Sequence, residues 1–271
     1  MLYNLIYFVY KNRIKKLKLH MKLAKLYLYT ILLTSLAITG CKSKKTDDDL
    51  IIPASESYNK GLSLLKENKH SKASEEFGKI FFQHPGNNLT PQAELMQAYS
   101  LFLSGEYDEV ADILDTFIKL HPMHTDIAYA YYLKALSYYM QISNIYLDQS
   151  KTNLAKQAFE DVIKRFPTTK YAIDSSLKID LVNDHLAGKE MEVGRYYLKK
   201  NNPISAIARF QSIIKEYQST SHAPEAIYRL VECHIMFGLN DEAKKYASVL
   251  GHNYPDSKWY KYAYELVIRT K

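Results

Sequence analysis

Apolar residues recur at helical spacing along most of the chain, and the clearest example is the stretch 186–217. There, one apolar stripe ends just before the sequence Asn201-Asn202-Pro203, and a second stripe begins just after it. Proline suits the first turn of a helix, because its missing N–H would have no partner there. The pattern therefore predicts a helix, a tight turn and a second helix.

The same unit recurs five times and can be aligned on a small residue in each second helix. In four units a large apolar residue follows four positions later, and in four a proline follows twelve positions later. Four units also have a glycine, alanine or valine twelve positions earlier. The alignment positions are Ala73, Val110, Ala155, Ala206 and Ala243. Small residues let two helices approach closely and proline ends the second helix, so the arrangement resembles the tetratricopeptide repeat.

We therefore predict an all-α protein, a right-handed superhelical solenoid of five tetratricopeptide hairpins followed by a C-terminal capping helix. The hairpins are expected at about 54–86, 90–122, 125–167, 170–218 and 222–255, and the capping helix within 256–271. In that last segment, Trp259, Tyr262, Ala263 and Leu266 are expected to cover the open face of the fifth hairpin.

Two of the five units are enlarged, because the alignment positions are 37, 45, 51 and 37 residues apart. In the third unit the first helix is in register, so the extra residues are expected between its helices, around Ser143 to Ser150. In the fourth unit the extra residues precede Gly194 and keep a helical stripe. This predicts one long helix from about Lys170 to Lys200, with Gly188 inside it at a cost of about 1 kcal/mol.

Residues 1–40 have the features of an export signal. They carry seven lysines and arginines and no acidic residue, and 26–38 form an apolar segment of 13 residues. As a helix this segment would be about 20 Å long, too short to span a bilayer core of about 30 Å. Met21 alone begins a well-formed signal, so Met1 and Met21 stay open as the true start.

The signal ends in Ile38-Thr39-Gly40-Cys41, which resembles the lipobox of bacterial lipoproteins. The resemblance implies cleavage before Cys41, which would carry a covalent lipid, with 41–53 as a tether. Several acyl chains give stable anchoring where one is marginal. The residue after the cysteine is Lys42, which favours the outer membrane, because aspartate at that place retains lipoproteins in the inner membrane of enteric bacteria.

Charge and chemistry exclude several function classes. The chain has a net charge of +7, but without the seven basic residues of 1–40 it has 29 basic and 29 acidic residues, which argues against nucleic acid as a partner. GxSxG, GxxxxGK[ST] and HExxH motifs are absent. We expect His121 and His124 to bind no metal, Cys233 to be a buried thiol, and the acidic residues to lie solvated among lysines. The sequence therefore predicts a binding scaffold without cofactor, and not an enzyme.

First helices line the concave groove of stacked tetratricopeptide hairpins, and here the groove positions of units one to three are apolar and aromatic. They are Tyr58, Leu62, Leu65, Leu95, Tyr99, Phe102, Tyr129, Tyr132, Leu136 and Tyr139. An open groove of this kind suits an extended peptide with aromatic anchors. The alternative, also open, is that neighbouring units or the closing helix bury these side chains.

Four stretches resemble the BamD family, the outer-membrane assembly lipoproteins of the β-barrel assembly machinery. They are 186–200, 206–217, 226–245 and 249–260, and the likeness covers about 54–262. Gln218 departs from the pattern, since proline is usual there. The resemblance implies a role in folding and inserting outer-membrane β-barrel proteins, at the periplasmic face of the outer membrane.

The resemblance also implies partners. The C-terminal repeats would bind a POTRA domain of the machinery's central barrel subunit, alongside other assembly lipoproteins, and the N-terminal repeats would receive the aromatic-ended targeting segment of unfolded β-barrel proteins. A basic residue at the end of the long helix would engage the central subunit; Lys200 matches best, with Lys199 and Arg195 as the other candidates. The competing interpretation is a periplasmic tetratricopeptide adaptor for another envelope complex, such as one that coordinates cell constriction.

Overall fold

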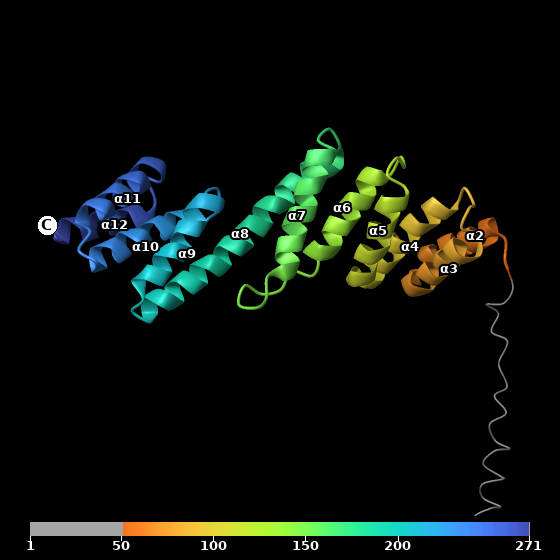
Figure 1. Ribbon diagram of the computed structural model, residues 1–271, viewed down its shortest axis with the longest axis horizontal. Coiled ribbons are helices and arrows are strands. Elements are labelled where there is room, and N and C mark those ends of the chain that lie inside the picture. Colours follow the sequence, from red (N-terminus) through yellow and green to blue (C-terminus); the bar gives the residue numbers. More distant parts are fainter. Residues whose placement is uncertain (1–50, 271) are drawn as a thin grey trace, which may run out of the picture. The chain divides into compact units, whose positions relative to one another are not determined.

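The computed structural model describes residues 51–270, so the expectations for the signal, Cys41 and most of the tether lie outside the described residues. Within the described part of the chain every regular element is an α-helix, and Figure 1 shows them following one another in chain order. The helices are α2 (Ala54–Lys66), α3 (His70–Gln83), α4 (Thr90–Ser104), α5 (Tyr107–Leu120), α6 (Ile127–Tyr139), α7 (Ser150–Arg165), α8 (Lys170–Lys199), α9 (Pro203–Glu216), α10 (Ala223–Met236), α11 (Asn240–Asn253) and α12 (Lys258–Arg269).

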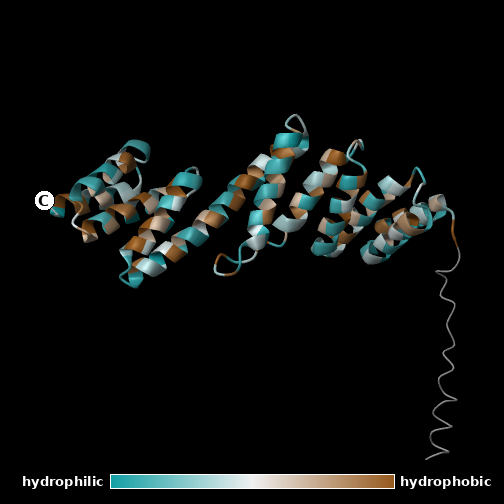
Figure 2. Cartoon of the chain, viewed as in Figure 1, coloured by the Kyte–Doolittle hydropathy of each residue, from teal (hydrophilic) through white to brown (hydrophobic). Residues whose placement is uncertain are grey.

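Consecutive helices pair into five hairpins, from α2 with α3 to α10 with α11. Among the helices of residues 51–270, each contacts only helices one or two places away in the chain. The first helices α2, α4, α6, α8 and α10 also contact one another in turn. Nearest-neighbour contacts of this kind are the mark of a repeat array, so the predicted all-α tetratricopeptide class is confirmed. Figure 2 shows apolar and polar residues alternating around the helices, as expected when each buries one face.

The small residue of a first helix allows the close approach that the sequence predicts. A Cβ built on Gly61 of α2 would lie 2.7 Å from the Phe77 ring of α3, closer than side chains approach. Phe77 is fully buried, and it fills the space that the missing side chain leaves. Glycine here is therefore a requirement of packing, because any side chain would displace the ring.

A left-handed residue ends the first helix in four of the five hairpins. These residues are Asn68, Gly105, Asn201 and Gly238, with φ between 57° and 86°. After Gly238, Leu239 N donates to His234 O over 2.9 Å, and Gly238 N donates to Ile235 O over 2.9 Å. The other three turns repeat this double hydrogen bond, which is the Schellman arrangement. Asparagine tolerates a left-handed conformation better than other side chains, which explains its use in two of the turns.

The two enlarged units are built as predicted. Residues 140–149 separate α6 from α7, and α8 is one helix of 30 residues. The Ile179 side chain of α8 packs with α7, whereas Met191, further along, packs with Phe210 of α9. Gly188 lies where the helix meets two other segments, since its Cβ would come 3.2 Å from His222 Nε2 and 3.7 Å from Ile145 Cγ2. Helix α8 thus joins the third hairpin to the fourth.

The closing helix α12 contacts α10 and α11, which is compatible with the predicted capping helix. Ala263 is fully buried against the fifth hairpin, and Leu266 packs beside it. The Trp259 ring stacks on Tyr228 of α10, with centroids 5.4 Å apart, and Tyr262 contacts Trp259 edge-on. Across residues 51–270, none of the helices combines the length and apolarity that crossing a bilayer requires.

Candidate functional site

A cavity of about 310 Å³ opens between the first helices of units two, three and four. It is lined by Gln92, Leu95, Met96, Tyr99, Asp126, Tyr129 and Tyr171. Three of the predicted groove residues, Leu95, Tyr99 and Tyr129, therefore share one cavity. Leu95 is 2% exposed and forms an apolar part of its wall, whereas the two tyrosines are half-buried.

Aromatic rings continue from this cavity along α6 and α8. The Tyr171 centroid lies 5.8 Å from that of Tyr129 and 5.1 Å from that of Tyr132. The Tyr132 hydroxyl donates a hydrogen bond to Asp174, which also pairs with Lys178 at 2.8 Å. Burial raises the pKa of both Tyr129 and Tyr132, so both phenols are neutral at physiological pH. Tyr132 is thus held in place, while Tyr129 lines the cavity as a neutral phenol.

The other predicted groove residues lie on the same series of first helices but within individual hairpins. Tyr58 and Leu62 pack against the core of the first hairpin, where the Tyr58 centroid is 5.4 Å from that of Phe77. Phe102 packs on Tyr107 of its own hairpin at 5.4 Å. Tyr139 packs on Phe159 of the third hairpin at 5.9 Å. The structure therefore gathers part of the predicted set around one cavity and distributes the rest along the face.

Four residues that line the cavity are not predicted from the sequence, namely Gln92, Met96, Asp126 and Tyr171. Tyr171 follows directly on the proline-terminated third unit, but it lies in the enlarged part of the fourth unit, far from the small residue Gly194. When groove positions are counted from Gly194 with the spacing of a normal repeat, Tyr171 is not among them. An aromatic residue in the first turn of α8 was the available signal.

The second predicted surface is the C-terminal end of α8. Lys199 and Lys200 are both exposed there, and Lys200 Nζ lies 5.9 Å from the centroid of the Tyr196 ring. Lys200 caps the helix. Two cations at the C-terminal end of a long helix are favoured by its dipole.

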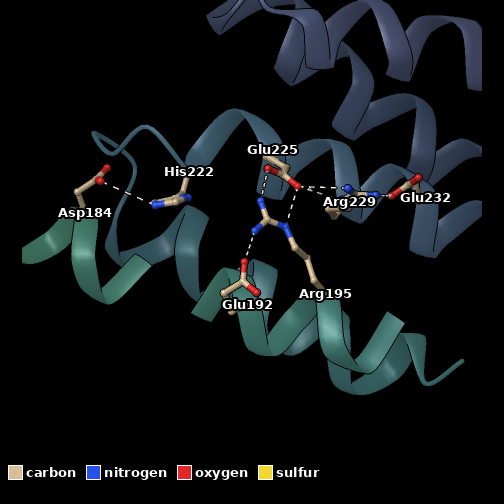
Figure 3. Close-up of polar contacts among 7 residues, drawn as sticks. All are labelled: Asp184, Glu192, Arg195, His222, Glu225, Arg229 and Glu232. Carbon is tan, nitrogen blue, oxygen red and sulfur yellow. Dashed lines mark hydrogen bonds and ion pairs between the residues drawn. The ribbon is translucent and has the colours of Figure 1, made fainter. Parts of the chain in front are cut away.

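Arg195, one turn earlier, lies at the centre of an ionic network between α8 and α10 (Figure 3). Its Nε donates to Glu225 Oε1 over 3.0 Å, and its guanidinium also contacts Glu192. Glu225 is only 7% exposed and also accepts from Arg229 over 3.2 Å. Arg195 therefore compensates a buried carboxylate within the chain, while its side chain stays 37% exposed.

The histidine and cysteine positions have local roles. His124 Nδ1 accepts a hydrogen bond from the Asp126 backbone N–H over 3.1 Å, so it shapes the turn before α6. In residues 51–270 no three His, Cys, Asp or Glu side chains are grouped to hold a metal ion. Cys233 is fully buried, as predicted, and burial raises the pKa of its thiol to about 12.

One expectation about the acidic residues is wrong. They do not all lie solvated among lysines, because Glu76, Glu94 and Glu225 are each less than 8% exposed. Glu76 and Glu225 have cationic partners, Lys60 at 2.8 Å and the two arginines of Figure 3. Glu94 has no hydrogen-bond partner among residues 51–270. The burial of these three carboxylates cannot be predicted from the local sequence, because it depends on contacts with neighbouring helices.

Comparison with known proteins gives a consistent family. Residues 52–250 match the family YfiO, described as "Outer membrane lipoprotein". A relative from Rickettsia prowazekii named outer membrane protein assembly factor BamD is 66% identical over 247 residues, covering 91% of this chain and 98% of the relative. A relative of the same name from Caulobacter vibrioides is 40% identical over 238 residues, covering 87% and 78%. This chain therefore belongs to the YfiO family of outer membrane lipoproteins, the family of the BamD assembly factors.

Proposed function

We propose that the chain is a lipid-anchored, non-enzymatic scaffold subunit of the complex that assembles β-barrel proteins in the outer membrane. The names of the relatives support a role in outer membrane protein assembly, and the five hairpins support the scaffold role. The observation that carries the proposal is the tyrosine-lined cavity between α4, α6 and α8, because it offers a binding surface to an unfolded substrate.

The N-terminal repeats receive a segment of the substrate that ends in an aromatic residue. An aromatic side chain fits the cavity because Leu95 and Met96 offer apolar surface, and the rings of Tyr129 and Tyr171 allow edge-on packing. The half-buried phenols supply donors to the backbone carbonyls of an extended segment. The proposed substrate-binding residues are Tyr58, Leu62, Leu95, Tyr99, Phe102, Tyr129, Tyr132 and Tyr139, and we add Tyr171 because it lines the same cavity.

The C-terminal repeats bind the POTRA domain of the central barrel subunit. Lys199 and Lys200 are exposed at the end of α8, and Arg195 lies one turn before them on the same helix. An acidic residue of the partner would pair with Lys200, and Arg195 would support that surface by fixing α8 to α10. Charges at such a rim govern orientation and association rate.

The anchor and the remaining partners complete the proposal. Cleavage after residue 40 leaves lipidated Cys41 as the first residue, and the tether 41–53 links it to the repeats at the periplasmic face of the outer membrane. Other assembly lipoproteins bind the same scaffold, and nucleic acid is not a partner. The matching experiment is Cys41→Ser: the variant is expected to leave the membrane fraction on a salt wash, and its retention there would contradict the anchor.

Substrate binding is tested with the full chain and a labelled peptide that copies the aromatic C-terminal end of an outer-membrane β-barrel protein. Tyr129→Ala is expected to weaken binding, measured by fluorescence anisotropy, at least about tenfold, as truncating a central aromatic anchor does. Tyr264→Ala is the control, because Tyr264 is 56% exposed on α12. Equal affinities for the two variants would overturn the assignment of the cavity.

Partner binding is tested by charge reversal in cells. Lys200→Glu is expected to reduce co-purification of the central barrel subunit, whereas Lys215→Glu, an exposed position on α9, leaves it unchanged. Undiminished co-purification with Lys200→Glu would remove Lys200 from the interface.

A further inference from the structure

A second cavity lies on a different side of α4, between the first and second hairpins. It holds about 240 Å³ and is lined by Phe81, Phe82, Glu94, Gln97, Asp112, Ile113 and Thr116, from α3, α4 and α5. It shares no lining residue with the tyrosine cavity: of two adjacent residues in α4, Glu94 faces one cavity and Leu95 faces the other. Nothing in the proposed function uses this second cavity.

Glu94 is the unusual member of the lining. It is 4% exposed, and neither carboxyl oxygen has a hydrogen-bond partner within the part of the chain that the structure describes. The nearest cationic candidate is His121, whose Nε2 lies 3.6 Å from Glu94 Oε2, beyond hydrogen-bond distance. A buried polar group without a partner costs free energy, and folded proteins retain few of them. The carboxyl of Glu94 is therefore free to accept hydrogen bonds from a group outside the described residues.

The protonation of Glu94 reflects the same environment. Burial raises the pKa of its carboxyl to about 7, and burial together with His124 lowers the pKa of His121. Near neutral pH the imidazole is thus mostly uncharged and does not stabilise the carboxylate. A cation that enters the cavity would supply the missing stabilisation and favour the ionised form.

The rest of the lining identifies the kind of cation. Phe81 and Phe82 are in edge contact at 5.3 Å, and with Ile113 they give the cavity apolar walls. Phe82 is 81% exposed and stands at the rim, where the exposed Asp112 adds a second negative charge. A ligand must therefore combine an apolar stem with a cationic head. Arginine fits better than lysine, because its planar guanidinium stacks on aromatic rings and pairs with both oxygens of a carboxylate.

We propose that this cavity binds an arginine side chain from an extended segment of a partner protein, with the guanidinium on Glu94 and the stem against Phe81 and Ile113. The Glu94 oxygens have almost no direct solvent contact, so side chains of the cavity lining must move before the guanidinium can reach them. The proposal is independent of the tyrosine cavity and would stand if that site bound nothing.

The test uses the full chain with ¹³C-labelled isoleucine methyl groups and observes Ile113 by NMR. The probe is the peptide acetyl-Ala-Ala-Arg-Ala-Ala-amide, compared with the same peptide carrying citrulline or lysine in place of arginine. Citrulline has nearly the shape of arginine without its charge. We expect a saturable shift of the Ile113 methyl signal with the arginine peptide, weaker binding with lysine and no saturable shift with citrulline.

The variant Glu94→Gln removes the charge and keeps the volume, and it is expected to weaken binding of the arginine peptide at least about tenfold. Glu109→Gln, an exposed position on α5 outside the lining, is the control and should bind as the natural chain does. The proposal is overturned if citrulline or lysine matches arginine, if Glu94→Gln binds unchanged, or if the control loses as much affinity. The citrulline comparison needs no variant, so it decides even if Glu94→Gln folds poorly.

Discussion

Gly194 of α8 faces the edge of the Phe210 ring of α9 so closely that a Cβ on the glycine would lie 2.7 Å from Phe210 Cζ. Phe210 is fully buried in the cluster that also holds Met191 and Ile213. The first hairpin repeats the relationship with Gly61 and Phe77. The large residue of the second helix thus occupies the space left by the small residue of the first.

The substitution Gly194→Ala is expected to lower the free energy of unfolding by about 1–3 kcal/mol, as overpacking a core does. In an exposed helix the same change would stabilise by about 1 kcal/mol, so the sign of the effect reports the clash. Urea unfolding measures it. Gly86→Ala is the control, since no atom of the described residues lies within 4 Å of a Cβ there. A Gly194→Ala protein as stable as the natural chain would show that the helices are further apart.

The turns after the first helices predict opposite effects at equivalent positions. Gly238 has φ 72° and Asn201 has φ 57°. Because a left-handed conformation is costly for a residue with a Cβ, Gly238→Ala is expected to destabilise by about 1 kcal/mol. Asn201→Gly relieves that cost and should stabilise by a few tenths to about 1 kcal/mol. Thermal unfolding of both variants tests this prediction. If the melting temperatures of the two variants shift in the same direction, the two turns do not share this geometry.

Glu94 predicts a pH dependence of stability. Its pKa is raised from 4.5 to about 7 on folding, so the folded state binds the proton more tightly than the unfolded state. The stability that this provides is complete below about pH 4.5 and is lost as the pH rises through 7. The glutamine of Glu94→Gln cannot ionise. As the pH rises from 5 to 8, the free energy of unfolding of the natural chain should therefore fall relative to that of the variant by on the order of 2 kcal/mol. Urea unfolding at several pH values measures this, with Glu109→Gln as the control; parallel curves for Glu94→Gln and the natural chain would refute the shift.

The ionic network at Arg195 predicts coupling between α8 and α10. Arg195→Ala leaves the buried Glu225 with Arg229 as its partner, so a loss of about 1–2 kcal/mol is expected. Adding Glu225→Gln should restore part of the lost stability, because the double variant no longer buries a carboxylate that has lost one of its two arginine partners. Lys199→Ala, an exposed neighbour, should change stability by less than about 0.5 kcal/mol. Additive losses in the double variant would mean that the pair does not interact.

The sequence predicts the fold well because the repeat places the same physical requirement at the same position each time. The glycines of α2 and α8, the prolines that end the second helices and the length of α8 all follow from local spacing. The turn glycines Gly105 and Gly238 are recognisable for the same reason. Asn68 is harder to recognise, because asparagine has many roles and only its φ of 58° shows that it replaces glycine.

The sites are predicted less completely, because they depend on contacts between units. Leu95, Tyr99 and Tyr129 follow from counting along first helices, but Tyr171 reaches their cavity only because α8 is extended. Glu94 looks like an ordinary helical carboxylate until α3 and α5 cover it. The pairing of Arg195 with Glu225 joins residues 30 positions apart, and no local pattern indicates it.

The most direct measurement of the proposed function is site-specific photo-crosslinking in living cells. A photoreactive residue in place of Gln92, on the wall of the tyrosine cavity, is expected to crosslink newly exported outer-membrane β-barrel proteins. The same residue in place of Glu265, exposed on α12, should give no such product. Crosslinks to β-barrel proteins at Gln92 alone would support the proposal that the tyrosine cavity receives substrates, and their absence at Gln92, or equal yields at both positions, would contradict it.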